Sequence, residues 1–215
     1  MLNIQRFACN MLQTNCFVVS DETREAVIID CSAFYDHEKE AIKQYISSNN
    51  LKPVRLIATH GHADHNIGNK FVADTWGLHV ELHSLDEPLM RDFAVQASAI
   101  CGFTIAPNDI APVGRYFDDG EVISFGRHRF NIIESPGHTP GGVVFYCKEE
   151  NVAFTGDTLF HYSIGRTDLP GGSMFMLIQS LRMLCQLPDV THIYPGHGED
   201  TTLGIELAGN PYLDR

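Results

Sequence analysis

Apolar residues recur along this chain with two periods, one typical of strands and one typical of helices. Short runs rich in β-branched and aromatic residues, set between turn residues, predict strands over 15–20, 25–30, 54–59, 121–125, 128–135, 143–148, 152–155 and 192–194. Apolar positions three and four residues apart predict helices over 36–50, 66–76, 84–100 and 174–187, the first capped by Asp36. Prolines and glycines predict a loop over 106–120.

The order of these elements predicts the layers of the fold. Two β-rich blocks, each followed by helices, favour an α/β architecture in which two sheets pack face to face with helices outside. A length of 215 residues suits one compact domain, and no repeat or linker divides the sequence. We therefore expect a single domain over residues 1–215.

Four predicted strands lead into loops that carry side chains able to bind metal ions. The strand over 54–59 runs into the segment His60-Gly61-His62-Ala63-Asp64-His65. Three later strands lead to His138, Asp157 and His197, each directly after a glycine that lets the backbone turn sharply. If these strands end along one edge, their loops meet in a single mouth.

The number of these side chains indicates a pair of ions. Seven imidazoles and carboxylates are too many for one tetrahedral zinc, but they suit two ions that share a carboxylate and a water. A closed structural zinc site is the competing interpretation, and it leaves less room for solvent. An isolated histidine is more often a hydrogen-bonded or solvent-facing residue than a ligand, and we interpret six in this way: His37, His79, His83, His128, His161 and His192.

These segments resemble the metallo-β-lactamase superfamily. Residues 59–65 match its T-H-x-H-x-D-H signature, and the P-G-H, G-D and G-H segments follow in the family's order. The resemblance implies a four-layer αββα sandwich of two mixed β-sheets. It also implies two divalent metal ions, zinc by preference with iron or manganese left open. One ion would be held by His60, His62 and His138 and the other by Asp64, His65 and His197, with Asp157 bridging them.

Residues after the shared carboxylate narrow the resemblance to one branch. Asp157 is followed by Thr-Leu-Phe and then by Gly165-Arg166, as in hydroxyacylglutathione hydrolase, known as glyoxalase II. Class B1 lactamases carry a cysteine in place of Asp157, which disfavours antibiotic hydrolysis. A lysine of glyoxalase II at the position of Arg166 contacts glutathione, so Arg166 is the candidate substrate-binding residue. A surface pair with Asp168 is an equal alternative.

The chain also departs from classical glyoxalase II. Only 18 residues follow His197, so we expect no C-terminal helical domain that binds glutathione. Asp168 and Glu199 stand where the family has tyrosines. The chain more closely resembles the short, single-domain glyoxalase II-like proteins.

The resemblance predicts a metal-dependent thioesterase that acts on a hydroxyacylglutathione such as lactoylglutathione. A hydroxide shared by the two ions would attack the thioester carbonyl, with Asp64 and Asp157 as the catalytic carboxylates. Asp30, at the end of a strand, is a candidate acceptor for the free N–H of a ligand histidine, and a turn or cap role is the alternative. Two other functions stay open: a persulfide dioxygenase with a single iron, and a non-enzymatic binding module whose ions brace its loops.

Composition limits the partners and the location. A net charge of −12 without a basic stripe disfavours nucleic acid and favours a small-molecule substrate. No apolar run approaches the length of a membrane span, and the first residues do not resemble a secretory signal, so we expect a cytoplasmic protein without membrane contact. The six cysteines contain no C-x-x-C pair and are expected to be buried thiols. The oligomeric state is left open.

Overall fold

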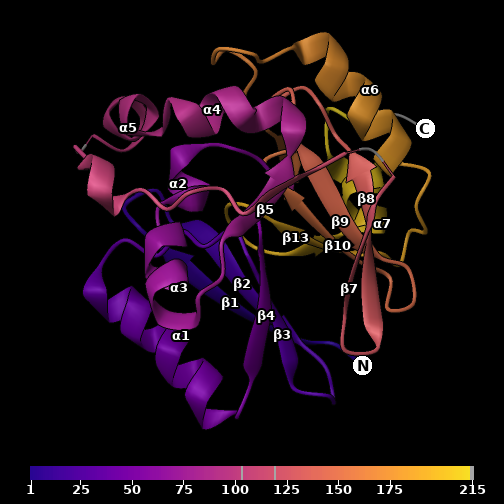
Figure 1. Cartoon of the computed structure of the whole chain (residues 1–215). Coiled ribbons are helices and arrows are strands. Elements are labelled where there is room, and N and C mark those ends of the chain that lie inside the picture. Colours follow the sequence, from indigo (N-terminus) through magenta and orange to yellow (C-terminus); the bar gives the residue numbers. More distant parts are fainter. Residues whose placement is uncertain (103, 119, 214–215) are drawn as a thin grey trace.

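The structure, a computed structural model, describes residues 1–102, 104–118 and 120–213. Within them, two six-stranded sheets lie face to face and helices cover the outer face of each sheet (Figure 1). Both sheets contain parallel and antiparallel neighbours. The predicted four-layer αββα sandwich of two mixed β-sheets is therefore confirmed.

The first sheet comes from the first half of the chain and follows chain order from edge to edge. The first three strands pair antiparallel with one another, and the third to the sixth run parallel to one another. The strands are β1 (Asn3–Cys9), β2 (Thr14–Ser20), β3 (Glu25–Ile29), β4 (Lys52–Ile57), β5 (Val80–His83) and β6 (Arg115–Phe117).

The second sheet has the order β14-β13-β10-β9-β8-β7, with one parallel pair between β10 and β13. A short two-stranded ribbon, β11 with β12, stands beside it. These strands are β7 (Val122–Phe125), β8 (His128–Glu134), β9 (Val143–Cys147), β10 (Val152–Gly156), β11 (Leu159–Phe160), β12 (Ser163–Ile164), β13 (His192–Pro195) and β14 (Thr201–Thr202).

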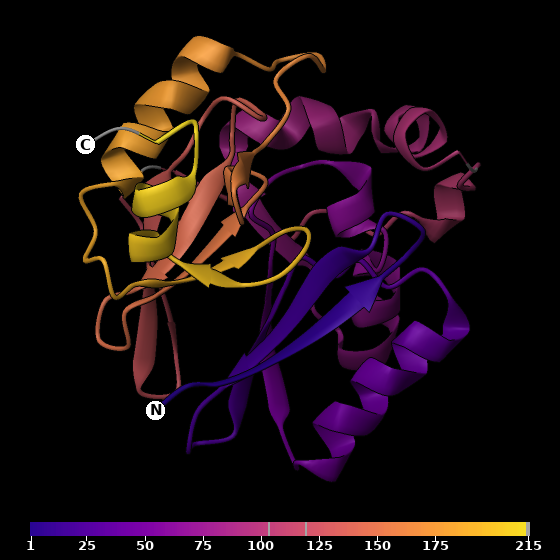
Figure 2. The same ribbon diagram turned by 180° about the vertical axis from the view of Figure 1, so that it is seen from behind.

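Helices form the outer layers. Figures 1 and 2 show α1 and α3 outside the first sheet, α6 and α7 outside the second, and α4 and α5 across one end of the sandwich. The helices and helical turns are α1 (Asp36–Ser48), α2 (Ala63–Asn66), α3 (Asn69–Trp76), η1 (Ser84–Asp86), α4 (Glu87–Arg91), α5 (Phe93–Gln96), η2 (Ala97–Cys101), η3 (Pro107–Asp109), α6 (Met174–Leu184) and α7 (Leu203–Gly209). No helix in the described ranges is long and apolar enough to cross a membrane.

Strand β2 shows why the sandwich needs four layers. All seven of its residues are buried, so both faces of this strand are covered. Phe17 and Val19 point into the core between the sheets, where they join Phe130, Phe145 and Phe154 of the second sheet. The alternate residues of the strand belong to a separate core under the first helical layer. The two-residue period of the strand thus divides its side chains between two cores.

Several predicted boundaries differ from the structure. The helix expected over 84–100 is instead η1, α4, α5 and η2, because Asp92 leaves helical geometry at φ −94° and ψ 21°. The loop expected over 106–120 contains β6, and its residue 119 lies outside the described part of the chain. Strands β1 and β5 were not expected. Asp36 is the first residue of α1 rather than its cap, and the cap is Tyr35.

A close backbone contact explains why the helix expected over 66–76 is interrupted. Helices α2 and α3 are separated at Ile67 and Gly68. A Cβ atom at Gly68 would lie 2.6 Å from the sulfur of Cys31, so only glycine fits there. All six cysteines, Cys31 among them, are free and buried, as the sequence predicts.

Candidate metal centre

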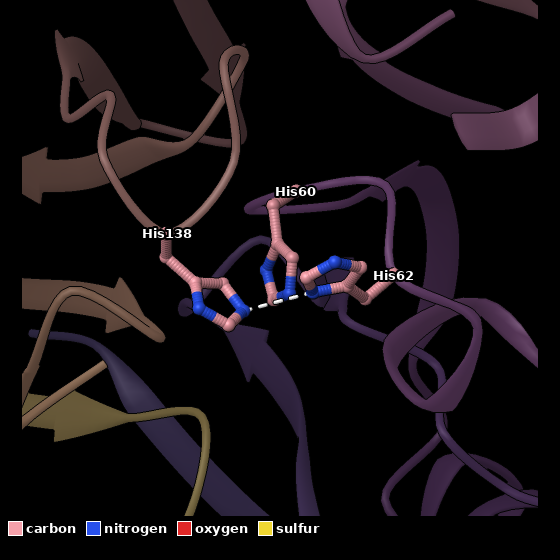
Figure 3. A group of neighbouring side chains, drawn as sticks. All are labelled: His60, His62 and His138. Atoms are coloured by element: carbon pink, nitrogen blue, oxygen red, sulfur yellow. Dashed lines mark hydrogen bonds between the residues drawn. The ribbon is translucent and has the colours of Figure 1, made fainter. Parts of the chain in front are cut away.

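Three histidines from two loops meet at the end of the sandwich where β4 and β8 finish. His60 and His62 follow β4, and His138 follows β8. His62 Nδ1 lies 2.8 Å from His138 Nε2, and the His60 ring is 4.9 Å from each of the other two, centroid to centroid. Figure 3 shows the three rings turned toward one another. All three side chains are buried, and their nitrogens could hold one ion.

A second group of three lies beside the first. His65 comes from α2, next to Asp64, and His197 follows β13. His65 Nε2 lies 3.3 Å from His197 Nε2, and the carboxylate of Asp64 lies 3.5 Å and 3.4 Å from these two nitrogens. These ligand atoms are also close enough together to hold one ion.

Asp157, at the end of β10, stands between the two groups. One carboxylate oxygen, Oδ2, lies 3.5 Å from His138 Nε2 in the first group and 3.6 Å from His197 Nε2 in the second. The other oxygen, Oδ1, lies 3.3 Å from His65 Nε2. The structure therefore brings together all seven side chains that the sequence singled out as ligands, and it puts the expected bridging carboxylate in the middle.

The state of the buried polar atoms fits a pair of cations. His60 Nε2 and Asp157 Oδ1 are buried, and neither meets the geometry of a hydrogen bond with any described residue. Buried polar atoms normally have a partner, and a metal ion is a partner for both an imidazole nitrogen and a carboxylate oxygen. The residues present therefore fit two divalent ions.

The electrostatics of the centre favour the same ions. Burial lowers the pKa of His62 to about 4, so its imidazole is neutral at pH 7 and offers a lone pair. Burial also lowers the pKa of His65, but Asp157 and Asp64 outweigh it and hold that pKa well above its ordinary value. Asp157 keeps its charge, because burial is outweighed by the three histidines around it and its pKa stays well below the usual range. Without ions, a proton on His65 supplies the positive charge that the carboxylates attract.

In each group, one histidine is oriented by a hydrogen bond at Nδ1, the ring nitrogen that faces away from the centre. Asp30 Oδ2 lies 3.0 Å from His65 Nδ1, and the same carboxylate accepts from the backbone N–H and the hydroxyl of Thr59. His138 Nδ1 donates to the backbone oxygen of Arg166 at 2.7 Å. These bonds fix the ring so that its other nitrogen faces the centre.

Comparison with known proteins agrees with this geometry. The profile of the metallo-beta-lactamase superfamily matches residues 9–197. The chain belongs to the metallo-β-lactamase superfamily. The hydroxyacylglutathione hydrolase GloC of Haemophilus influenzae is 36% identical over 220 residues, which cover 99% of each chain. Superfamily membership and the clustered ligands together support a metal-dependent hydrolase.

Two solved structures are similar over nearly the whole chain. The BLEG-1 B3 metallo-beta-lactamase has a TM-score of 0.88 and 33% identity, covering 99% of both chains. TTHA1623, in a di-iron-bound form, has a TM-score of 0.86 and 36% identity, covering 97% of this chain and 100% of that one. Iron is therefore a metal that a similar protein binds.

The remaining candidates of the sequence lie outside the seven-residue group. Arg166 is exposed and forms two 2.7 Å hydrogen bonds with Asp168, the surface pair that was its alternative role. None of the six histidines interpreted as non-ligands reaches the centre. His128 does lie close enough to Asp21 and Glu22 to form another potential ion group, but its two nitrogens are engaged by Asp21 and Glu150.

The sequence did not point to Asp86, a fully buried carboxylate in η1. It accepts hydrogen bonds from the backbone of Gly61 at 2.7 Å and of Gly141 at 2.6 Å, and from the hydroxyl of Thr139 at 2.8 Å. Gly61 lies between two ligand histidines, and Thr139 follows His138 directly. Asp86 thus joins the two loops that form the first histidine group.

Replacing Asp86 with alanine is expected to loosen both loops. Three buried donors lose their acceptor, so the free energy of unfolding should fall by about 3 kcal/mol. Affinity for the first ion should fall about 10- to 100-fold, as it does when a residue that orients a ligand is lost. Urea unfolding and competition with a chromophoric chelator measure the two effects. Asp118→Ala, which removes an exposed carboxylate bonded to Ser84 in the same η1 turn, is the control. Unchanged metal affinity in Asp86→Ala would show that Asp86 does not orient the two ligand loops.

Proposed function

We propose that this protein is a binuclear metal-dependent hydrolase that cleaves thioesters of the hydroxyacylglutathione type. The observation that carries the proposal is the position of Asp157 between two groups of three ligands, since a carboxylate so placed could be shared by a pair of ions. The similarity to GloC, which is named a hydroxyacylglutathione hydrolase, supports the substrate class.

The chain's own residues prepare the centre for hydrolysis. Two bound divalent cations supply a water of lowered pKa and Lewis acidity toward the carbonyl oxygen. His60, His62 and His138 would hold one cation, and Asp64, His65 and His197 the other, with Asp157 between them. The hydroxyl of Thr14 donates to Asp64 Oδ2 at 3.1 Å and fixes the carboxylate that we expect to orient the attacking water. A thiolate is a good leaving group, so the site needs no general acid.

Arg166 is the proposed contact for the substrate carboxylate. Its own backbone oxygen binds His138, and its side chain is 62% exposed. Substrate binding would exchange Asp168 for a carboxylate of the ligand, because a guanidinium binds either as a bidentate pair.

Replacing Arg166 with alanine is therefore expected to raise KM for lactoylglutathione about three- to tenfold with little change in kcat. Steady-state kinetics measure the effect. Asp168→Asn, which weakens the competing pair and keeps the arginine, is the matched control and should leave KM equal or lower. An unchanged KM in Arg166→Ala would show that Arg166 does not contact the substrate and forms only its surface pair with Asp168.

Three assays on the metal-loaded protein test the proposed function. Hydrolysis of lactoylglutathione is the expected activity. Oxygen consumption with glutathione persulfide would instead indicate the single-iron dioxygenase, although seven clustered ligands exceed what one iron requires. Hydrolysis of a cephalosporin is measured as well, because BLEG-1 is named a B3 lactamase and the argument from Asp157 concerns class B1. Bound metal with no turnover in any assay would favour a binding module.

A further inference from the structure

An apolar cavity of about 450 Å3 opens beside the first histidine group. His62 forms one part of its wall. The rest comes from η1, α4, α5 and η2, from Pro140 in the His138 loop, and from residues 169–171 in the segment before α6. Figures 1 and 2 both show that segment passing close to α4. The volume is in the range of pockets that hold small-molecule ligands.

The wall of this cavity is apolar, although it lies beside the histidines and carboxylates of the candidate metal centre. Leucine, isoleucine, valine, proline and alanine side chains dominate the described lining, which contains no lysine or arginine. Asp92 is its one carboxylate. At the rim, Leu85 is 58% exposed and Val95 is 72% exposed, so large apolar side chains face solvent around the opening. Gathered exposed apolar groups mark a binding site more often than isolated ones do.

We infer that this cavity binds the acyl group of the thioester, and that the enzyme prefers thioesters whose acyl group has a longer apolar chain than lactoyl has. The inference rests on the proposed function, because a thioester carbonyl held at the first histidine group would lie beside His62, which forms part of the cavity wall. Two substituents are attached to that carbonyl carbon: the acyl chain and the sulfur of the carrier. Thiol carriers such as glutathione are polar and anionic, so a wall with no described cation and one carboxylate disfavours them and suits the acyl chain.

Helix α4 ties the cavity to the metal centre. Leu89 lines the cavity and also packs on the ligand loop, since a Cβ atom at Gly61 would lie 3.0 Å from Leu89 Cβ. The acyl chain would therefore lie against the same helix that contacts the loop between His60 and His62. A chain that fills the cavity fixes the carbonyl at the histidine group.

A series of acyl thioesters on glutathione tests the inference. From acetyl through butanoyl to hexanoyl, kcat/KM should rise about fourfold for each methylene that the cavity covers. Changing the carrier from glutathione to coenzyme A with the same acyl group should leave this dependence on chain length unchanged. A flat series, or a dependence on carrier in place of chain length, would overturn the inference.

Val95→Asp puts a charge at the rim and should lower kcat/KM for the hexanoyl thioester about tenfold, with a loss at least about fivefold smaller for the acetyl thioester. Val190→Asp is the matched control, because Val190 is 70% exposed, close to the 72% of Val95, and does not line the cavity. Equal losses in the two variants, or none in Val95→Asp, would contradict the assignment.

A binding measurement separates this inference from the proposed function. Ketone analogues, in which a methylene stands between the carbonyl and the glutathione sulfur, cannot be hydrolysed. Calorimetry with the metal-free protein should show Kd falling about fourfold per acyl methylene, and less in Val95→Asp. If no thioester is hydrolysed but this trend holds, the proposed function fails and the cavity assignment stands. If thioesters are hydrolysed and the trend is absent, the cavity assignment fails alone.

Discussion

Replacing Asp157 with alanine is expected to lower kcat/KM for thioester hydrolysis at least about 10³-fold, because losing the carboxylate between the two groups of ligands would weaken the cations that supply the activated water and the Lewis acid. The carboxylate of Asp157 lies close to both groups of ligands, to His138 on one side and His197 on the other. Without it, the two ions lose their shared ligand. Metal content should fall below two ions per chain, as measured by elemental analysis of the same sample.

A matched control separates this loss from a general effect of removing a buried charge. Glu206→Gln, in α7, neutralises a fully buried carboxylate that binds His161 and Thr201, away from the seven ligands. It should change stability and leave metal content at two ions. Circular dichroism should show that Asp157→Ala keeps the fold. Near-normal turnover in Asp157→Ala would defeat the mechanism.

Removing the metal is expected to destabilise the whole protein. An ion that binds only the folded state stabilises it by about 4 kcal/mol when its free concentration is a thousand times its Kd. Part of this stabilisation would come from His60 Nε2 and Asp157 Oδ1, which make no hydrogen bond with the described residues and would gain a metal ion as partner. Urea unfolding before and after chelation, with zinc then added back, measures the change. The same midpoint with and without metal would show that these residues hold no ion.

The metal-free protein should also respond to pH in a defined direction. The pKa of His65 is raised in the folded state, so its contribution to stability is complete below its unfolded pKa of about 6.5. That contribution is lost as the pH rises through the folded pKa. The free energy of unfolding of the chelated protein should therefore fall as the pH rises through the folded pKa of His65. In the metal-bound protein, the ions take the place of that proton. Unfolding midpoints at a series of pH values test this, and an alkaline gain in stability would contradict it.

The sequence predicted the layers and the ligands because both follow from short-range patterns. The two-residue period of strands such as β2 indicates how each face is covered, and the segment from His60 to His65 holds four ligands within six residues. His138, Asp157 and His197 could be found because each follows a predicted strand and a glycine. These three residues meet only if their strands end at the same edge of the sandwich. The two β-rich blocks in the sequence favour that arrangement, because they predict two sheets packed face to face.

Other features depend on contacts that no local pattern reveals. Asp86 lies 25 residues from Gly61 and 53 residues from Thr139 in the sequence, and it accepts a hydrogen bond from each. Only the folded chain shows that it joins the two ligand loops. The apolar residues of 84–100 have helical spacing, yet they form four short helical segments that line a cavity, because Asp92 leaves helical geometry. Strand β6 has three residues inside a loop-like sequence and forms only because β5 offers an edge.

The most direct test of the central claim is a titration of the metal-free protein with zinc, followed by thioester hydrolysis at each step. Two ions held by seven shared ligands predict that two equivalents bind and that turnover reaches its maximum only at the second. Turnover that saturates at one equivalent, or the absence of thioester hydrolysis after two ions have bound, would contradict the account.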